Sequence, residues 1–362
     1  MPRISWENNV LGFVPRKDWL DVPFQVTRPD DPADRLFNDD KTDNIIAEWD
    51  SIASMYQIPV MAQFHGFDTE SQKTFRVPVD NHNIEKGLIK VKINQSERLR
   101  ALLRNGVQND SAIYDYVIND GVRLAEQVVT RTKVAKNELL AYGNITIHEN
   151  NLDLTVDYGV PEANKGLTID VGAGASSDIT AQFQSIVDQA REAGVVITGM
   201  YTSNAFLSKC RANAAFQKAI NGTTAIGATV RRTAFEEYMS EEYGINEIIT
   251  NDLTYGADYT IDQYNRPQVT LERYYPKDKV TFFARTVGRE IGTGLWGDPP
   301  EIDVANLLDV NGSSESPYVY ITQWAENDPS VLWTKASSLF MPVLYNPNGL
   351  YIANVTETPA EA

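Results

Sequence analysis

The fold of this chain is decided by its closing segment, which reads Ile321-Thr322-Gln323-Trp324-Ala325-Glu326-Asn327-Asp328-Pro329, then residues 330–340, then Met341-Pro342-Val343-Leu344-Tyr345-Asn346-Pro347-Asn348-Gly349-Leu350-Tyr351-Ile352-Ala353-Asn354-Val355. It contains two apolar runs typical of strands, each interrupted by a proline. Residues 346–349 predict a tight turn, because proline presets φ and asparagine or glycine accepts positive φ at little cost. No side chain here suits catalysis, so the pattern indicates packing. We expect residues 341–355 to complete a sheet that begins near Asn144.

The composition predicts an ordered chain with more than one subdomain. Its 362 residues are 42% hydrophobic, which is enough to bury a large core. The formal net charge of −17 argues against tight binding of nucleic acid, because phosphate binding needs clustered lysine and arginine. From Glu301 onward eight residues are acidic and only Lys335 is basic, whereas residues 73–104 are rich in lysine and arginine. This distribution suits self-association by complementary charge, although ordinary solubility explains the acidity equally well.

The cysteine count and the apolar pattern restrict the compartment. Cys210 is the single cysteine, which excludes a disulfide framework and a cysteine-rich zinc site. The N-terminus has no apolar signal core, and no apolar run is long enough to span a bilayer. We therefore expect a protein made in the cytoplasm, with no membrane partner.

The first part of the chain predicts an arm and a helix. Residues 1 to about 42 contain five prolines and an acidic stretch, which predicts an extended arm lying over something larger than itself. A short helix is expected at residues 43–55, where apolar side chains recur on one face.

Residues 58–94 predict a long hairpin. The return strand at residues 89–93 alternates apolar and basic residues, so Lys90 and Lys92 share one face. A hairpin this long and polar cannot bury itself in its own domain, and isolated hairpins are marginal in water. We therefore expect it to lie on another subunit. The side chains expected to contact an acidic surface of that neighbour are Lys73, Arg76, Lys90 and Lys92.

The middle of the chain predicts one long helix, then a region of α/β character. Asp110 is a typical N-cap, and residues 111–141 carry apolar side chains at helical spacing as far as Gly143. Two alternating runs after it predict a hairpin. We expect its strands at 144–148 and 152–158, a helix capped by Asp178, a buried strand at 195–200, a helix at 203–220, strands with an acidic loop within 243–275, and a strand at 280–284.

The sequence contains one literal nucleotide-binding pattern, Gly292-Thr293-Gly294-Leu295-Trp296-Gly297. A dinucleotide site needs this motif between a strand and a helix of a βαβ unit. Here Asp298-Pro299-Pro300 follows, with no helix or second parallel strand after it. The glycine-rich stretch 172–177 lacks the lysine of a P-loop. We therefore expect no cofactor.

No other residues combine into a catalytic or metal site. The three histidines show neither metal-ligand nor triad spacing. Asp252, Asp258 and Asp262 are not spaced as in an EF-hand loop, so a solvated acidic loop is expected. Cys210 lies on an apolar helix face, where cysteine acts as a small buried hydrophobe. The sequence therefore predicts no catalytic residue and no metal.

In their order along the chain, four stretches resemble the lambda-type major capsid protein family (major capsid protein E) of tailed bacteriophages, which has the Hong Kong 97-like fold. Residues 61–94 are similar to the family's E-loop, and residues 111–158 to its spine helix and peripheral sheet. Residues 178–220 are similar to the start of its axial domain. Residues 274–286 together with 328–355 are similar to its closing section. The resemblance implies an α+β fold with an N-terminal arm, an E-loop hairpin, a peripheral domain with a long spine helix, and an axial domain. The implied boundaries are 1–57 for the arm and short helix, 58–95 for the E-loop hairpin, 96–175 for the peripheral domain with its spine helix and hairpin, 176–275 for the axial domain, and 276–362 for the return segment and the closing strands of the peripheral domain.

The function implied by this resemblance is structural, not enzymatic. Hexamers and pentamers would form an icosahedral shell around packaged double-stranded DNA, without sequence-specific binding. The shell would be assembled in the host bacterial cytoplasm and remain in the virion. The implied partners are a portal, a decoration protein and a separate scaffolding protein, since no long charged coiled-coil region precedes the E-loop. Covalent lysine–asparagine cross-links are not implied.

Three alternatives stay open at this stage. An encapsulin-like nanocompartment shell shares the fold, and would co-purify with cargo protein instead of a portal. A phage tail structural protein would form tubes instead of closed shells. A nucleotide-dependent enzyme would use residues 292–297 and would be stabilised by a dinucleotide.

Overall fold

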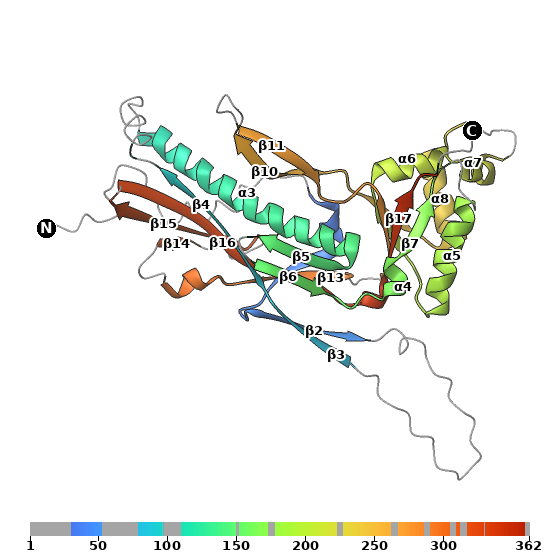
Figure 1. The fold of residues 1–362 in the computed structure, drawn as a ribbon, viewed down its shortest axis with the longest axis horizontal. Coiled ribbons are helices and arrows are strands. Elements are labelled where there is room, and N and C mark those ends of the chain that lie inside the picture. The colour runs from blue at the N-terminus through green and yellow to red at the C-terminus, as the bar shows by residue number, and fades with distance from the viewer. Residues whose placement is uncertain are drawn as a thin grey trace, which may run out of the picture.

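The computed structural model describes residues 30–52, 79–95, 97, 110–149, 152–172, 178–222, 227–261, 267–285, 290–304, 309–311, 317–328 and 330–358. The protein is elongated (Figure 1). A long helix lies along a sheet at one end, and a group of shorter helices surrounds a second sheet at the other. Two clusters of buried apolar side chains are present: one lies around the long helix and its sheet and extends to one side of the second sheet, and the other lies between the second sheet and the shorter helices.

A six-stranded sheet is built around one long strand. Its members are β1 (Phe37–Lys41), β4 (Gly87–Gln95), β13 (Gly292–Gly297), β14 (Asp309–Asn311), β15 (Tyr320–Asn327) and β16 (Ser330–Leu344). The order is β1-β13-β16-β15-β14, and β4 also pairs with β16. The length of β16, 15 residues, lets it pair antiparallel with two strands along one edge, β15 through its N-terminal part and β13 through its C-terminal part, while β4 pairs with it along the opposite edge. β1 is parallel to β13.

Helix α3 (Asp110–Tyr142) covers one face of this sheet (Figure 1). Leu124, Val128 and Leu139 of the helix are buried in one cluster with Trp296 and Phe340 of the strands. The predicted helix is confirmed to within one residue at each end. Gly143 follows it with a φ of 70°, a conformation that costs glycine little.

A five-stranded sheet forms the other end of the molecule. Its order is β7-β17-β12-β8-β9, with bounds Leu167–Asp170 for β7, Gly199–Thr202 for β8, Glu247–Thr250 for β9, Lys279–Phe283 for β12 and Leu350–Thr356 for β17. The helices here are α4 (Glu162–Lys165), α5 (Ile179–Glu192), α6 (Asn204–Ala212), α7 (Ala214–Asn221) and α8 (Arg232–Tyr243). Phe183 of α5 contacts the rings of Phe206, Phe216 and Phe282, so one aromatic side chain connects these helices with the sheet.

Three hairpins and three short 3-10 helices complete the described elements. The hairpins pair β2 (Ile46–Ile52) with β3 (Val79–Glu85), β5 (Asn144–Glu149) with β6 (Leu152–Asp157), and β10 (Thr254–Ile261) with β11 (Pro267–Arg273). The 3-10 helices are η3 (Pro32–Arg35), η6 (Pro300–Val304) and η7 (Pro347–Gly349). The predicted β5–β6 hairpin and the predicted strand at 280–284 are confirmed.

The closing segment does not complete a sheet with residues near Asn144, as the sequence had suggested. The segment divides at the turn: β16 belongs to the six-stranded sheet, and β17 pairs with β12 and β7 in the five-stranded sheet. Among the described strands, β5 pairs with β6 alone. The 3-10 turn at Pro347–Gly349 thus connects a strand of one sheet with a strand of the other. The residues of the turn predict a reversal of the chain, but they do not specify which sheet each flanking strand joins.

One prediction for the N-terminal region is wrong within the described residues, and another is refined. Residues 30–41 of the expected arm are not irregular, because Leu36 and Phe37 are buried and β1 is a member of the six-stranded sheet. Residues 46–52 form strand β2, not a helix. The expected apolar helix face is not buried, since Ile45 and Ile46 are 56% and 46% exposed, and pairing with β3 decides the conformation.

Three details of the middle region also differ from expectation. The strand predicted at 195–200 begins only at Gly199, and Val196 is 68% exposed. The helix predicted at 203–220 is broken at Asn213, whose side chain accepts a hydrogen bond from the Ala215 N–H and begins α7. Helix α8 was not predicted. The helix that follows Asp178 is confirmed, with the expected face buried; Asp178 occupies its N-cap position, but its side chain makes no capping hydrogen bond.

Candidate subunit-contact site

The sequence-predicted basic residues fall partly on strand β4. Lys90 and Lys92 are exposed on one face of the strand, and Ile89 and Val91 pack against the core from the other face. The predicted alternation is therefore confirmed. β4 belongs to the six-stranded sheet, however, and not to the projecting hairpin, whose described strands are β2 and β3. Lys73 and Arg76 lie outside the described residues.

Two tryptophans form a platform beside these lysines. The register of the sheet places Trp324 of β15 directly opposite Trp333 of β16, and their rings stack with centroids 6.1 Å apart and planes 16° apart. The ammonium of Lys92 lies 4.3 Å from the centroid of the Trp333 ring. That of Lys335 lies 5.8 Å from the Trp324 ring. Cation–π attraction therefore fixes two basic side chains over one aromatic surface.

An ion pair limits the positive charge of this face. Lys335 Nζ lies 2.6 Å from Glu301 Oε1, and both side chains are largely shielded from solvent. Burial, the largest single cause, raises the pKa of Glu301, but the hydrogen bond from Lys335, a main-chain hydrogen bond and the charges of Lys335 and Lys90 together outweigh it, so the pKa is lowered. Glu301 therefore stays ionised at neutral pH. Lys90 and Lys92 remain the exposed cations of the face, and neither Lys335 nor Glu301 was expected there from sequence.

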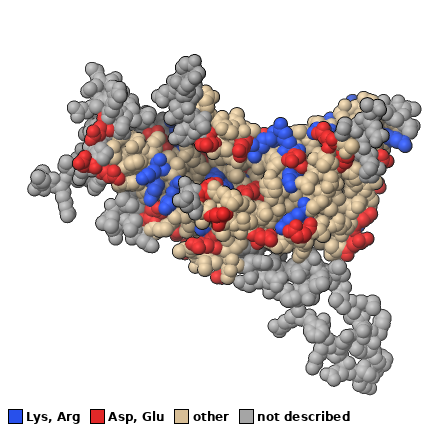
Figure 2. Space-filling view, viewed as in Figure 1, with Lys and Arg blue, Asp and Glu red and all other residues tan. Residues whose placement is uncertain are grey.

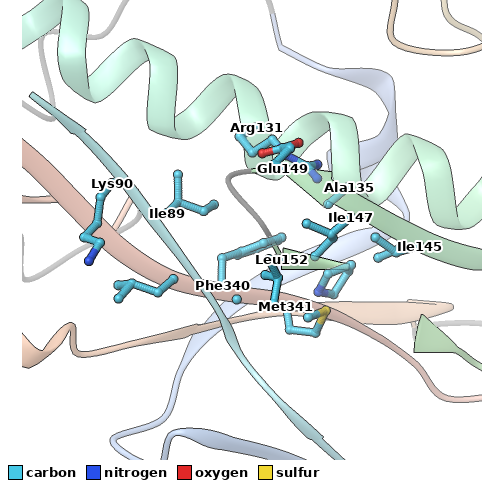
Figure 3. A pocket seen from close by; sticks show the side chains of 13 residues that line it. Ile89, Lys90, Arg131, Ala135, Ile145, Ile147, Glu149, Leu152, Phe340 and Met341 are labelled. Carbon is cyan, nitrogen blue, oxygen red and sulfur yellow. The ribbon is translucent and has the colours of Figure 1, made fainter. Parts of the chain in front are cut away.

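The opposite side of β4 borders an apolar hollow of about 180 Å³. It is enclosed by β4, α3, the β5–β6 hairpin and the end of β16 (Figure 3). Ile89, Ile147 and Met341 line it, and Leu152 stands at its mouth with 49% exposure. The ion pair between Arg131 Nε and Glu149 Oε1, at 3.1 Å, closes one rim. The hollow therefore offers an apolar interior with a charged border.

The described residues do not combine into a catalytic or metal-binding arrangement. No group of three or more His, Cys, Asp or Glu among them is placed to hold a metal ion. His148 pairs with Asp153 at 2.8 Å on the surface. Asp252 is hydrogen-bonded by Arg273 and Asn204. Asp262, His65 and the side chain of His82 lie outside the description.

Two features that suggested chemistry have structural explanations. The Gly292–Gly297 motif forms strand β13, not a phosphate-binding turn. A Cβ on Gly292 would lie 2.1 Å from the main-chain oxygen of Val343, so close strand packing requires glycine there. Cys210 is fully buried in α6 and burial raises the pKa of its thiol, as expected of a small apolar residue. None of the helices in the described ranges is long and apolar enough to cross a membrane.

Comparison with known proteins places these features in context. Residues 67–355 match the family model of phage major capsid protein E. Among solved structures, the chain is similar to a phage-related protein from Bordetella bronchiseptica RB50, with 9% identity, a TM-score of 0.52, and coverage of 92% of this chain and 95% of that one. It is also similar to a proposed capsid protein of an Escherichia coli CFT073 prophage, with 12% identity, a TM-score of 0.51, and coverage of 94% and 97%. No curated protein sequence matches the chain.

The mixed fold and the family match define a class, the structural proteins that form the shell of a phage. The chain belongs to the phage major capsid protein E family, whose model covers most of its length. It is therefore a component of the virion and not an enzyme. The compartment, tail and nucleotide-dependent alternatives are not favoured by this membership.

Proposed function

We propose that copies of this chain assemble as hexamers and pentamers into an icosahedral head shell, which encloses the double-stranded DNA of a tailed phage. The observation that carries this proposal is the β2–β3 hairpin, which projects from the body of the molecule (Figure 1). A two-stranded hairpin is marginal alone in water. A neighbouring subunit supplies the surface that it needs.

The architecture is that of the Hong Kong 97-like fold. The six-stranded sheet with α3 and the β5–β6 hairpin corresponds to the peripheral domain, and the five-stranded sheet with α5 to α8 corresponds to the axial domain. The boundary between 96–175 and 176–275 separates the two approximately along the middle of the chain, because β7 of the five-stranded sheet precedes it. Most of the buried apolar side chains of α5 to α8 form a cluster of their own, which supports a separate axial domain.

A second copy of the chain occupies both sides of β4. On one side, the exposed Lys90 and Lys92 attract an acidic surface, and the net charge of −17 makes every neighbouring copy a source of one. On the other side, the hollow next to Leu152 accepts apolar side chains. One exposed ion pair contributes only about 0.2–1 kcal/mol. Because the same contacts recur at every subunit interface, their free energies add up to a stable shell.

The packaged DNA is enclosed without sequence-specific binding. Acidic and basic side chains are interspersed on the face drawn in Figure 2, without a continuous basic surface. Tight DNA binding needs such a surface, because affinity grows with the number of phosphates that lysine and arginine neutralise. A weakly binding wall would leave the DNA free to be packed and ejected. Retention of DNA by purified subunits at low salt with high affinity would contradict this part of the proposal.

The remaining partners follow from the family resemblance. A separate scaffolding protein guides assembly in the host bacterial cytoplasm, a portal occupies one vertex, and a decoration protein binds the finished shell. Electron microscopy of the expressed chain, alone and with the scaffolding protein, tests the assembly. Closed shells are the expected result. Open tubes, or single subunits under every condition tried, would reject the proposed function.

A further inference from the structure

The β10–β11 hairpin carries two exposed apolar side chains on one face. Val269 and Leu271 of β11 are 58% and 69% exposed, and alternate residues of a strand point to the same face. Among the described strands, β11 pairs with β10 alone. A two-stranded hairpin is marginally stable by itself in water, because it needs a further surface on which to bury apolar side chains. The hairpin therefore has an apolar face that the described part of its own chain leaves open.

The opposite face of the hairpin contacts its own chain. Tyr255 of β10 pairs with Glu272 of β11 in the register, and its hydroxyl donates a hydrogen bond to Glu272 Oε2 at 2.9 Å. The ring of Tyr255 also contacts that of the buried Tyr274, with centroids 5.0 Å apart. Because Leu271 precedes Glu272 in the strand, its side chain points away from these contacts. The apolar face is thus turned away from the contacts that hold the hairpin, which extends away from the five-stranded sheet (Figure 1).

A surface of the same character lies at the hollow between β4, α3 and the β5–β6 hairpin (Figure 3). Leu152 lines the hollow, and Leu154 stands opposite Ile147, which also lines it. Leu152 and Leu154 are 49% and 37% exposed, so they continue the apolar lining outward along β6. The hollow measures about 180 Å³, and a cavity of about 150 Å³ is large enough to hold benzene. It can therefore accept an aliphatic side chain of a partner.

The two apolar surfaces have the same spacing. Leu152 and Leu154 are two residues apart on one face of β6, and Val269 and Leu271 are two residues apart on one face of β11. In both strands this places the side chains roughly 6.6 Å apart. One strand laid along the other therefore brings two apolar side chains of each into contact at once.

The charges beside the two surfaces have opposite sign. The exposed acidic side chains among the described residues of the hairpin are Asp258 and Glu272. The cations that border the hollow are Lys90 and Arg131, of which Arg131 already pairs with Glu149 of its own chain. Lys90 is exposed and stays available to a neighbour. Attraction between Lys90 and the acidic hairpin favours this pair of surfaces over a contact of like charge.

We propose that the β10–β11 hairpin of one copy docks on the hollow of a neighbouring copy, where Val269 and Leu271 cover Leu152 and Leu154. The inference rests on the proposed function, since it names the segment that fills the hollow in the assembled shell. The contact joins two different surfaces, so it is head-to-tail, and such contacts close into rings when the rotation between copies allows it. One type of contact can therefore connect all members of a hexamer or of a pentamer.

Cross-linking of cysteine variants in the assembled shell tests the contact. Cys210 is the single cysteine and is fully buried, so introduced thiols react selectively. Chains with Leu152→Cys and chains with Leu271→Cys are given tags of different length, mixed, assembled and treated with a short bis-maleimide. A product that joins one chain of each kind is then intermolecular by construction. This product should form severalfold more than in the control, which pairs Leu152→Cys with Val196→Cys, because Val196 is 68% exposed but lies outside both surfaces.

The outcome separates this inference from the function on which it rests. Electron microscopy of the same sample shows whether shells have formed. Closed shells in which Leu152→Cys and Leu271→Cys chains cross-link no better than the control pair would overturn the docking of the hairpin and leave the proposed function intact. If the wild-type chain forms no shells, the proposed function is rejected and this inference with it.

Hydrogen exchange of the wild-type chain decides the question without any variant. Peptides covering residues 267–273 should exchange at least about tenfold more slowly in shells than in unassembled chains, because docking suppresses local opening of the hairpin. Peptides covering residues 194–198 are the internal control and should keep their rate. Equal exchange of residues 267–273 in both states would overturn the proposal.

Discussion

The ammonium of Lys86 donates a hydrogen bond to the main-chain oxygen of Trp296 at 2.8 Å, at the root of the projecting hairpin. The same ammonium donates to the main-chain oxygen of Thr42 at 2.8 Å, and the Lys86 N–H donates to the oxygen of Ile45 at 2.9 Å. Lys86 is only 2% exposed, and its burial lowers its pKa. Because it lies between β3 and β4, it fixes the direction in which the hairpin leaves the six-stranded sheet.

Replacement of this lysine should weaken the hairpin root. In Lys86→Met, the carbonyl oxygen of Thr42 loses the ammonium donor, and the carbonyl oxygen of Trp296 keeps only the Thr42 N–H at 3.0 Å. A buried acceptor left without a partner costs about 1–3 kcal/mol, so the free energy of unfolding should fall by about 2 kcal/mol. Denaturant titration of the unassembled chain measures it. Lys218→Met, at an exposed position of α7, is the control and should stay within about 0.5 kcal/mol of wild type. Equal stability of the two variants would show that Lys86 does not hold the hairpin.

Charge reversal on the exposed face of β4 should reduce assembly. The double variant Lys90→Glu, Lys92→Glu turns attraction for an acidic neighbour into repulsion at every copy, because like charges in contact suppress association. Shell yield after sedimentation should fall strongly, whereas the melting temperature should change little. Lys218→Glu, at an exposed position of α7, makes the same reversal at one site elsewhere, with half the change in net charge, and should assemble as wild type. Normal shells from the double variant would exclude this face as a subunit contact.

Helices α3 and α5 and the hairpin β5–β6 were predictable because their signals are local. Asp110 begins α3, Gly143 follows its end with positive φ, and Asp178 occupies the N-cap position of α5, so each helix end is indicated within a few residues. The alternation around Lys90 and Lys92 gave their shared face for the same reason. Such signals act within one element, and they do not depend on which element lies beside it.

Sheet membership was less predictable because it depends on distant segments. Nothing within β16 or β17 indicates that one pairs with residues 292–297 and the other with residues 279–283. The contact of Lys92 with Trp333, and the partner of Lys335 on η6, likewise join segments far apart in the sequence. Thr322, Trp324 and Glu326 stand at every second position of β15, so the sequence could have shown that their side chains share one face of the strand. It could not have shown that Trp333 lies opposite Trp324.

A charge at the mouth of the hollow should block a neighbouring subunit. Leu152 is 49% exposed on β6 and lines the hollow. In Leu152→Arg the chain should fold normally, because the position is open to solvent, but burial of the guanidinium under a neighbour would be costly. Shell yield should therefore fall while the melting temperature stays close to wild type. The matched control is Val196→Arg, because Val196 is an exposed apolar residue at the other end of the molecule, 68% exposed. Assembly of Leu152→Arg at the level of Val196→Arg would mean that the hollow stays uncovered in the shell.

The glycines of β13 should be required for packing. A Cβ on Gly294 would lie 2.5 Å from Asp39 Oδ1 and 3.0 Å from Cε of Lys136, so it would displace the buried ion pair between these two residues. Breaking a buried pair costs about 3–5 kcal/mol, and partial displacement should cost less. We expect Gly294→Ala to lower the free energy of unfolding by about 2 kcal/mol, as typical overpacking does. Gly166→Ala is the control, because its φ of −96° suits alanine and the nearest atom, Glu162 O, would lie 3.9 Å away. Because this motif is a strand, addition of a dinucleotide should stabilise neither the variants nor the wild type in the same denaturant titration. Stabilisation of the wild type alone would support the nucleotide-binding alternative.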